Sequence, residues 1–229
     1  MYFIYRFAGL LVVILILSAG QTPAGEVERY RYQQRTGAQT EYFDWRLSKG
    51  AELQLHTRQQ QETTTTVFNP DLSTLSWSIN SPNTQTALTV IRTGDTLVMN
   101  GVFEGDDINK KVSIDPAPWY QALSVSLRQF VDPQQESVHF WTIRPDTLDV
   151  HRLQVSNEKT TTIEIDNHTV PAIQLKIQPT GWRAPFWSAN YWLGKDDGVF
   201  IRYQGRSGPP GTPLTSVVLV GPLVADSSF

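Results

Sequence analysis

The segment Thr86–Phe103, with the sequence TALTVIRTGDTLVMNGVF, contains the pattern that decides the fold. Two runs rich in Val, Ile and Thr, Thr86–Thr93 and Thr96–Phe103, flank a short connection at Gly94-Asp95. Residues of these types favour strands, and a connection that contains Gly is typical of a β-hairpin. The segment therefore predicts two antiparallel strands joined by a tight turn.

The same pattern recurs along most of the chain. It is clearest in Ala172–Gln178, where Ile173, Leu175 and Ile177 alternate with polar residues, so that one face of this strand should be buried and the other solvated. The other predicted strands are Val27–Gln34, Thr40–Leu47, Ala51–Arg58, Thr63–Phe68, Thr74–Ile79, Ser137–Arg144, Thr147–Val155, Thr160–Ile165, Trp187–Leu193, Val199–Gln204 and Ser216–Val220.

A single segment has the period of a helix. Its apolar residues recur at offsets of 0, 4, 8 and 11, at Trp119, Leu123, Leu127 and Phe130. Pro118 suits the first turn of a helix, and Asp132-Pro133 would end it. The sequence therefore predicts a mainly β protein, with a strongly curved antiparallel sheet or half-barrel and one central α-helix. A closed barrel is the alternative.

The first 25 residues have the features of a signal peptide. Arg6 precedes an apolar run, Phe7–Ala19, that is shorter than the ~20 residues of a membrane-spanning helix, and small residues follow it. We expect a signal peptide at 1–25 and a single β-rich domain at 26–229. The expected location is periplasmic, or secreted after cleavage. The alternative is anchoring in the inner membrane through the uncleaved N-terminal segment, which would be the only contact with a membrane.

Composition excludes several classes of protein. The net charge of -3 gives no basic excess for binding nucleic acid, so no nucleic-acid partner is predicted. A hydrophobic content of 40% with 11% aromatic residues is too high for a disordered chain. The chain has no Cys, so the fold has no disulfide and depends on its core.

Known catalytic and metal-binding motifs are missing from the sequence. The histidines, His56, His139, His151 and His168, lack the spacing of metal ligands, although His139 or His151 near Asp149 leaves a general base open. The acid pairs Asp106-Asp107 and Asp196-Asp197 adjoin Gly in predicted turns. No catalytic residue, metal site or cofactor is therefore predicted.

The most informative stretch is aromatic and spans Gly181–Tyr203, GWRAPFWSANYWLGKDDGVFIRY. Its rings either fill the core of the curved sheet or line a cavity, where aromatic side chains give a large contact area at a small entropic cost. Two rings at the start of the helix would form the opposite wall, and two arginines would orient a polar group of the ligand. The predicted ligand-binding residues are Trp119, Tyr120, Arg183, Trp187, Tyr191, Trp192 and Arg202.

The C-terminal strands resemble those of an exported bacterial β-rich family of unknown function. The resemblance covers about 90 residues and rests on Tyr191-Trp192-Leu193, the turn Lys195–Gly198, the return strand Val199–Tyr203 and a last strand at Ser216–Leu219. It implies a long curved sheet that the last strand closes. The architecture is also similar to half-barrel periplasmic lipoprotein carriers, which hold acyl chains under a helix.

Three functions remain open from the sequence. The first is a non-enzymatic protein that binds a hydrophobic or glycan-like ligand, or a partner in the bacterial cell envelope. The second is a structural or assembly protein that recruits an envelope protein through an edge strand. The third is an envelope polysaccharide hydrolase with two carboxylates. The sequence favours a protein that is not an enzyme, and its expected partners are a lipid or glycan ligand or an envelope protein.

Overall fold

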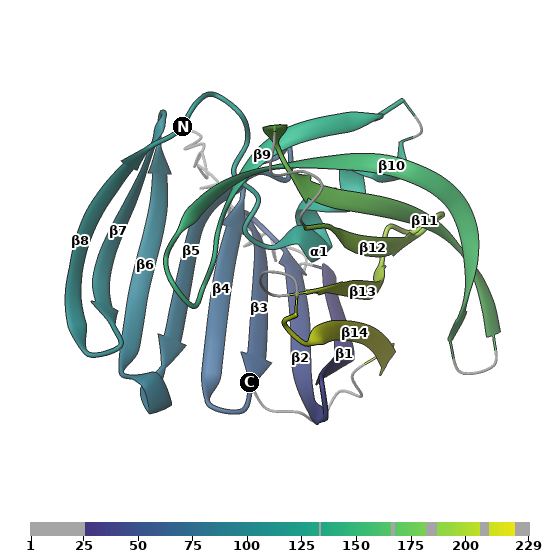
Figure 1. The fold of residues 1–229 in the computed structure, drawn as a ribbon, viewed down its shortest axis with the longest axis horizontal. Coiled ribbons are helices and arrows are strands. Elements are labelled where there is room, and N and C mark those ends of the chain that lie inside the picture. Colours follow the sequence, from purple (N-terminus) through teal and green to yellow (C-terminus); the bar gives the residue numbers. More distant parts are fainter. Residues whose placement is uncertain (1–25, 133, 166–167, 182–186, 207–210, 223–229) are drawn as a thin grey trace, which may run out of the picture.

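The computed structural model describes residues 26–132, 134–165, 168–181, 187–206 and 211–222 of the chain. The strands in these ranges form one antiparallel sheet whose two halves face each other, with a short helix between them (Figure 1). The predicted signal peptide and Arg183 lie outside the described residues.

The order of the strands across the sheet follows the chain, apart from one crossover. It is β8-β7-β6-β5-β4-β3-β2-β1-β14-β13-β12-β11-β10-β9. The strands are β1 (Glu26–Thr36), β2 (Gln39–Lys49), β3 (Leu53–Gln59), β4 (Glu62–Phe68), β5 (Thr74–Ser81), β6 (Thr86–Thr93), β7 (Thr96–Phe103), β8 (Asp106–Ser113), β9 (Ser137–Ile143), β10 (Val150–Ile165), β11 (His168–Pro179), β12 (Ala189–Gly194), β13 (Phe200–Arg206) and β14 (Leu214–Pro222). The sheet is curved but open, since β8 and β9 end it without pairing with each other. The predicted fold class is confirmed.

The predicted hairpin of β6 and β7 is present. Thr93 pairs with Thr96, and Gly94 has a φ of 58°, a conformation that favours glycine. Shifts of register within β1, β4, β10 and β12 mark bulges, which bend and twist strands and so help the sheet to curve.

Two of the strands differ from the sequence prediction. The chain pairs continuously through Val150–Ile165, so the strands predicted at Thr147–Val155 and Thr160–Ile165 are one long strand, β10. Strand β8 was not predicted, because its sequence, DDINKKVS, has few apolar residues. It forms because β7 offers a complete edge with which its backbone pairs from Asp106 to Ser113.

The helix is shorter than predicted. Helix α1 spans Leu123–Ser126 and continues as a 3₁₀ turn at Leu127–Val131, so the prediction that it begins at Pro118 is wrong. The backbone from Pro118 to Tyr120 is extended instead, because it hydrogen-bonds to β9: Trp141 N–H donates to Pro118 O and Tyr120 N–H donates to Trp141 O, each over 2.8 Å.

The segment from Ile114 to Ala122, which we call the crossover segment, joins the two halves of the sheet. Besides its bonds to β9, it accepts a hydrogen bond at Trp119 O from Thr74 N–H of β5 over 2.7 Å. The side chains of Trp119 and Tyr120 are 0% and 3% exposed and lie in two adjacent parts of the core. The crossover segment therefore connects β5 and β9, which are far apart in the order of the sheet.

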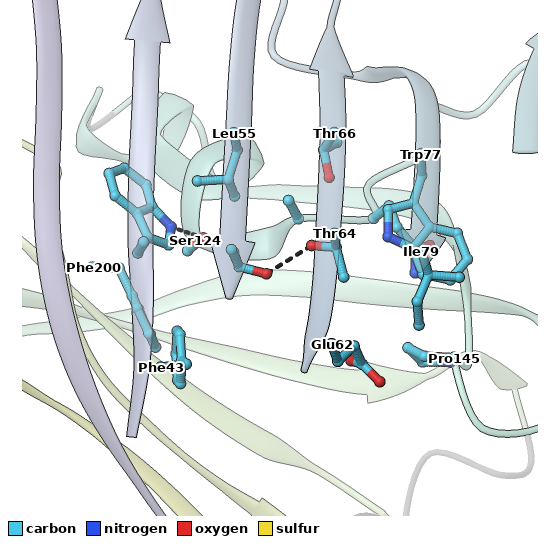
Figure 2. Close-up of a pocket in the computed structure, with 14 residues that line it drawn as sticks. Phe43, Leu55, Glu62, Thr64, Thr66, Trp77, Ile79, Ser124, Pro145 and Phe200 are labelled. Carbon is cyan, nitrogen blue, oxygen red and sulfur yellow. Dashed lines mark hydrogen bonds between the residues drawn. The ribbon is translucent and has the colours of Figure 1, made fainter. Parts of the chain in front are cut away.

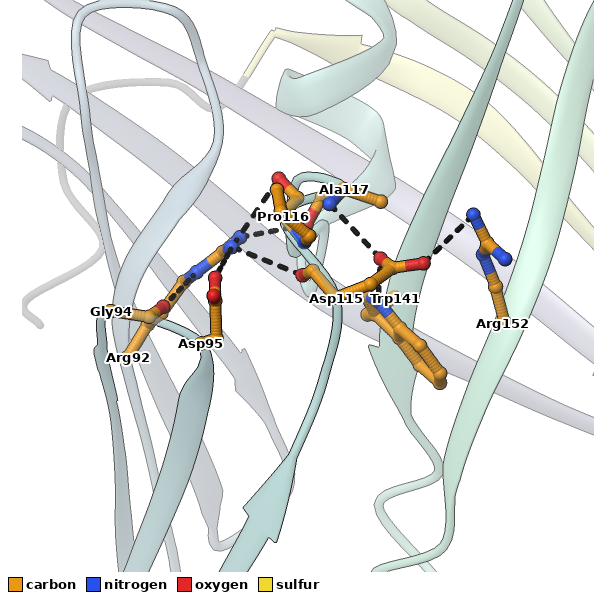
Figure 3. Close-up of polar contacts among 8 residues, drawn as sticks. All are labelled: Arg92, Gly94, Asp95, Asp115, Pro116, Ala117, Trp141 and Arg152. Atoms are coloured by element: carbon orange, nitrogen blue, oxygen red, sulfur yellow. Dashed lines mark hydrogen bonds and ion pairs between the residues drawn. The ribbon is translucent and has the colours of Figure 1, made fainter.

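Charged side chains hold the start of the crossover segment (Figure 3). The carboxylate of Asp115 accepts a hydrogen bond from Trp141 Nε1 over 2.7 Å and forms an ion pair of 2.8 Å with Arg152. On the other side, Arg92 of β6 donates to Ala117 O over 2.8 Å. The hydrogen bond from Trp141 lowers the pKa of Asp115, an effect that burial opposes and that Arg152 and Arg92 reinforce. Both halves of the sheet thus fix this segment.

Gln121 completes the connection at the other end of the crossover segment. Its Oε1 accepts from Trp119 Nε1 over 3.1 Å and from Ile143 N–H over 3.0 Å, while its Nε2 donates to Ile143 O over 2.9 Å. Its backbone N–H donates to Thr74 Oγ1 over 2.9 Å. The side chain of Gln121 therefore pairs with both backbone polar groups of Ile143, the last residue of β9.

No helix within the described ranges has the length and apolar character needed to span a membrane.

We predict that Gln121→Ala destabilises the protein by about 2–3 kcal/mol, because it leaves the Ile143 N–H and C=O groups without their partner. Urea unfolding of the two proteins measures the difference. Gln134→Ala, at an exposed position, is the control and should be nearly neutral. An unchanged midpoint for Gln121→Ala would show that the crossover segment does not depend on this side chain.

Candidate functional site

The concave face of the sheet holds two cavities that share part of their lining. The first has a volume of about 210 Å³ and the second about 290 Å³. Phe43 and Phe200 border both cavities, as do Gln121 of the crossover segment and Ser124 of α1. The two cavities are therefore lobes of one hollow, which we call the groove.

Strands β2 to β5 form the wall of the first lobe. Figure 2 shows Leu55, Thr64 and Trp77 on adjacent strands pointing into the same space. Most of the lining is aromatic or aliphatic, and a row of hydroxyls crosses it: Thr57 and Thr64 hydrogen-bond to each other over 2.7 Å, and Thr66 lies beside them. This lobe can thus accept an apolar group beside a few hydroxyls.

Strands β1 and β12 to β14 contribute the second lobe. Tyr191 and Tyr203 are paired across β12 and β13, with ring centroids 5.0 Å apart in an edge-on arrangement. Gln34, Thr215 and Val217 complete this side. Burial raises the pKa of both tyrosine hydroxyls, so they are neutral hydrogen-bonding groups over the ordinary pH range.

Among the described residues that line the groove, only Glu62, at the start of β4, has a carboxylate. Figure 2 shows it beside Pro145, at one end of the first lobe. Burial raises the pKa of Glu62, and a hydrogen bond from Ser81 opposes this only in part. A partly desolvated acid in an apolar hollow is a candidate for contact with a ligand.

An ion pair fixes the helical segment against the sheet beside the groove. Arg128 donates two hydrogen bonds to Glu28 of β1, over 3.0 and 2.8 Å, and its guanidinium lies 5.4 Å from the ring centre of Trp45. Lys49 also contacts Glu28, over 2.9 Å. Trp45 Nε1 in turn donates to Ser124 Oγ over 3.0 Å, so Trp45 connects the groove to α1.

Burial acts to raise the pKa of Glu28, but the hydrogen bonds from Arg128 and Lys49 outweigh it and leave this pKa below its usual value of 4.5. The carboxylate is therefore charged at neutral pH, and the pair contributes to stability as long as Glu28 stays ionised.

The structure separates the ligand-binding residues predicted from the sequence. Tyr191 lines the second lobe of the groove. Trp192, the next residue, points to the opposite, convex face, where the guanidinium of Arg202 lies 5.4 Å from its ring centre. Trp119 and Tyr120 are buried in the core and do not border either lobe.

Two predicted residues precede β12 in the sequence. Trp187 packs at the margin of the core, and its Nε1 donates to Arg206 O over 2.5 Å. Arg183 lies outside the described residues. The predicted residues therefore do not converge on one site in the part of the chain that the structure describes, and only Tyr191 borders the groove.

Half of the lining residues lie in the N-terminal half of the chain, where the sequence did not suggest a site. Phe43, Trp45 and Leu55 follow the alternation of ordinary core residues, and Thr57, Thr64 and Thr66 follow that of strand-forming residues. The run of threonines in β4 is the nearest signal in the sequence, since Thr64 and Thr66 of this run line the groove. The sequence does not show that this face is left partly uncovered.

The fold is similar to that of a β-barrel-like protein of the domain of unknown function DUF1849 from Brucella abortus, with a TM-score of 0.62 and 11% sequence identity over 88% of this chain and 98% of that one. Two other solved structures have lower TM-scores. MucB has a TM-score of 0.34 and 8% identity over 91% of this chain and 56% of its own, and a LolA superfamily protein from Nitrosomonas europaea has 0.26 and 6% over 90% and 89%.

No protein-family model matches the sequence, and no curated protein does. The predicted resemblance to a β-rich family of unknown function is confirmed at the level of the fold. Because one fold can serve unrelated functions, this likeness does not assign an activity.

We predict that acid weakens the protein partly through Glu28. Because the pKa of Glu28 is lower in the folded state than its usual 4.5, the stability that it contributes is present above that pH and is lost as the pH falls through the folded-state pKa. Glu28→Gln should lower the free energy of unfolding by about 1–3 kcal/mol at neutral pH, since it leaves Arg128 partly buried without its carboxylate.

The variant should also lose less stability than the wild type between neutral and acidic pH. Urea unfolding at a series of pH values measures both effects, and Glu52→Gln, at an exposed position, is the control. Parallel pH curves for wild type and Glu28→Gln would contradict the assignment.

Proposed function

We propose that this protein binds an apolar or amphipathic ligand of the cell envelope, such as a lipid, with the apolar part of the ligand in the groove. We also propose that residues 1–25 direct its export and that 26–229 form one ligand-binding domain. The observation that carries the proposal is the two-lobed hollow on the concave face, lined mainly by aromatic and aliphatic side chains.

The size and lining of the groove support this function. Pockets for small ligands typically have volumes of about 300–1,000 Å³, apolar walls and a few polar groups that orient the ligand. The lobes, of about 210 and 290 Å³, share Phe43 and Phe200 and so fit one elongated ligand. Glu62, Gln121 and the threonine and tyrosine hydroxyls are among its polar groups.

The other two functions have less support from the described residues. A polysaccharide hydrolase of the usual kind needs two carboxylates across the bond that it cleaves, whereas the described lining of the groove includes Glu62 alone. An edge strand that recruits a partner is best long and apolar, whereas β8 carries Asp106, Asp107, Lys110 and Lys111, and charges on an edge discourage pairing. At the other edge, Trp141 and Ile143 of β9 already hydrogen-bond to the crossover segment.

Native mass spectrometry of the protein purified from its own envelope tests the proposal directly. A stoichiometric lipid that is released on denaturation and identified by mass is the expected result. A glycan in the same place would replace the lipid as ligand. If the protein carries no ligand and also fails to bind the fluorescent dye N-phenyl-1-naphthylamine, the proposed function is wrong.

We predict that Thr64→Trp blocks binding by filling the first lobe. The probe is N-phenyl-1-naphthylamine, a neutral dye whose fluorescence rises in an apolar site. Thr63→Trp is the matched control, because it places the same ring on the neighbouring residue, which is exposed on the opposite face of β4. Titration of both variants should show lost binding only for Thr64→Trp, while equal affinities would place the dye elsewhere.

We predict a similar contrast between two adjacent residues of β12. Tyr191→Ala should weaken binding of the dye several-fold, because Tyr191 lines the second lobe. Trp192→Ala should leave the affinity unchanged, because Trp192 faces the convex side. Circular dichroism of both variants checks that they fold. Loss of binding in Trp192→Ala alone would support a ligand site on the convex face instead.

A further inference from the structure

Two carboxylates face the concave side at the end of the groove where β4 begins. Glu62 lines the first lobe directly. Glu41 of β2 lies two residues before Phe43 and so shares its face, and it accepts hydrogen bonds from Gln59 Nε2 over 2.5 Å and Gln60 Nε2 over 3.2 Å. The polar groups beside these acids are thus amides and the hydroxyl of Ser81, which are neutral.

The nearby basic side chains point elsewhere or are already paired. Arg46 and Arg58 alternate with the groove residues Trp45 and Thr57, so they lie on the convex face. On the concave side, Arg128 and Lys49 both bind Glu28. Beside Glu62, Pro145 is flanked by Arg144 and Asp146, which pair with each other over 2.5 Å. The described residues form no ion pair with Glu62.

On the basis of the proposed function, we infer that the groove selects an amphiphile whose polar end donates hydrogen bonds or carries a positive charge, with Glu62 as its acceptor. Hydrogen bonds between an ammonium group and a carboxylate are about twice as strong as neutral ones. A carboxylate or phosphate on the ligand would instead lie beside a partly desolvated negative charge, and two like charges repel more strongly where water is excluded. Glu62 therefore discriminates both by attraction and by repulsion.

The environment of Glu62 agrees with this role. Burial raises its pKa, which means that the site stabilises the carboxylate less well than water does. A positively charged donor supplied by the ligand would correct this and would favour the ionised form. Without a ligand, the groove therefore leaves the negative charge of Glu62 only partly stabilised.

Competition between three amphiphiles with the same twelve-carbon chain tests the inference. Dodecylamine, dodecanol and dodecanoate, each below its micellar concentration or solubility limit, compete at neutral pH with N-phenyl-1-naphthylamine bound to the protein. We expect dodecylamine to displace the dye at a concentration about tenfold lower than dodecanoate, a ratio that corresponds to about 1.4 kcal/mol. Dodecanol should lie between them.

Variants identify the group responsible. Glu62→Gln should bring dodecylamine and dodecanoate to nearly equal potency and leave dodecanol unchanged, and Glu62→Lys should reverse their order. Glu52→Gln removes the same charge from an exposed loop and should keep the wild-type order. Dye binding by each variant shows that its groove is intact.

The outcomes separate this inference from the proposed function. If all three amphiphiles displace the dye equally from the wild type, or if dodecanoate is the strongest, the groove binds apolar chains but the inference about Glu62 is wrong. If the preference for dodecylamine persists in Glu62→Gln, another group causes it and the inference is also wrong. If neither dye nor amphiphile binds, the proposed function fails and the inference fails with it.

Discussion

Hydrogen bonds from the crossover segment to strands β5 and β9 hold the two halves of the sheet in one curved arrangement. Trp119 O accepts from Thr74 N–H, while Pro118 and Tyr120 pair with Trp141 through their backbones. The side chain of Gln121 then satisfies the end of β9. Because these bonds are short and lie among buried residues, breaking them would leave backbone groups unsatisfied. The concave face and its groove depend on this connection.

The groove exists because α1 and its 3₁₀ extension cover only part of the concave face. Leu127 and Phe130 are fully buried in the same core cluster as residues of β1, β2 and β11, and the pair of Arg128 with Glu28 fixes this turn against β1. A longer helix that began at Pro118, as the sequence predicts, would have covered a different part of the concave face. Because the chain from Pro118 to Tyr120 pairs with β9 instead, the region over β2 to β5 stays partly open.

Strand alternation, as much as residue type, determines which charged side chains face the groove. In β2 and β3 each arginine adjoins a concave residue and therefore points outward, whereas Glu41 and Glu62 share the parity of Phe43 and Thr64. The arginines of these two strands therefore lie on the face opposite to Glu41 and Glu62. This arrangement leaves the hollow apolar with an acidic end, which suits an amphiphile with a hydrogen-bond donor at its polar end.

The sequence by itself determined the mainly β class, most strands and the hairpin at Gly94, because alternation and turn residues are local properties. It did not determine β8, whose polar residues form a strand only because β7 offers an edge. It also did not determine the site. Alternation along the strand puts Tyr191 and Trp192 on opposite faces, but only the tertiary structure shows that the face of Tyr191 borders the groove. Only the tertiary structure brings Phe43 next to Phe200, because a cavity is defined by contacts between residues that are far apart in the chain.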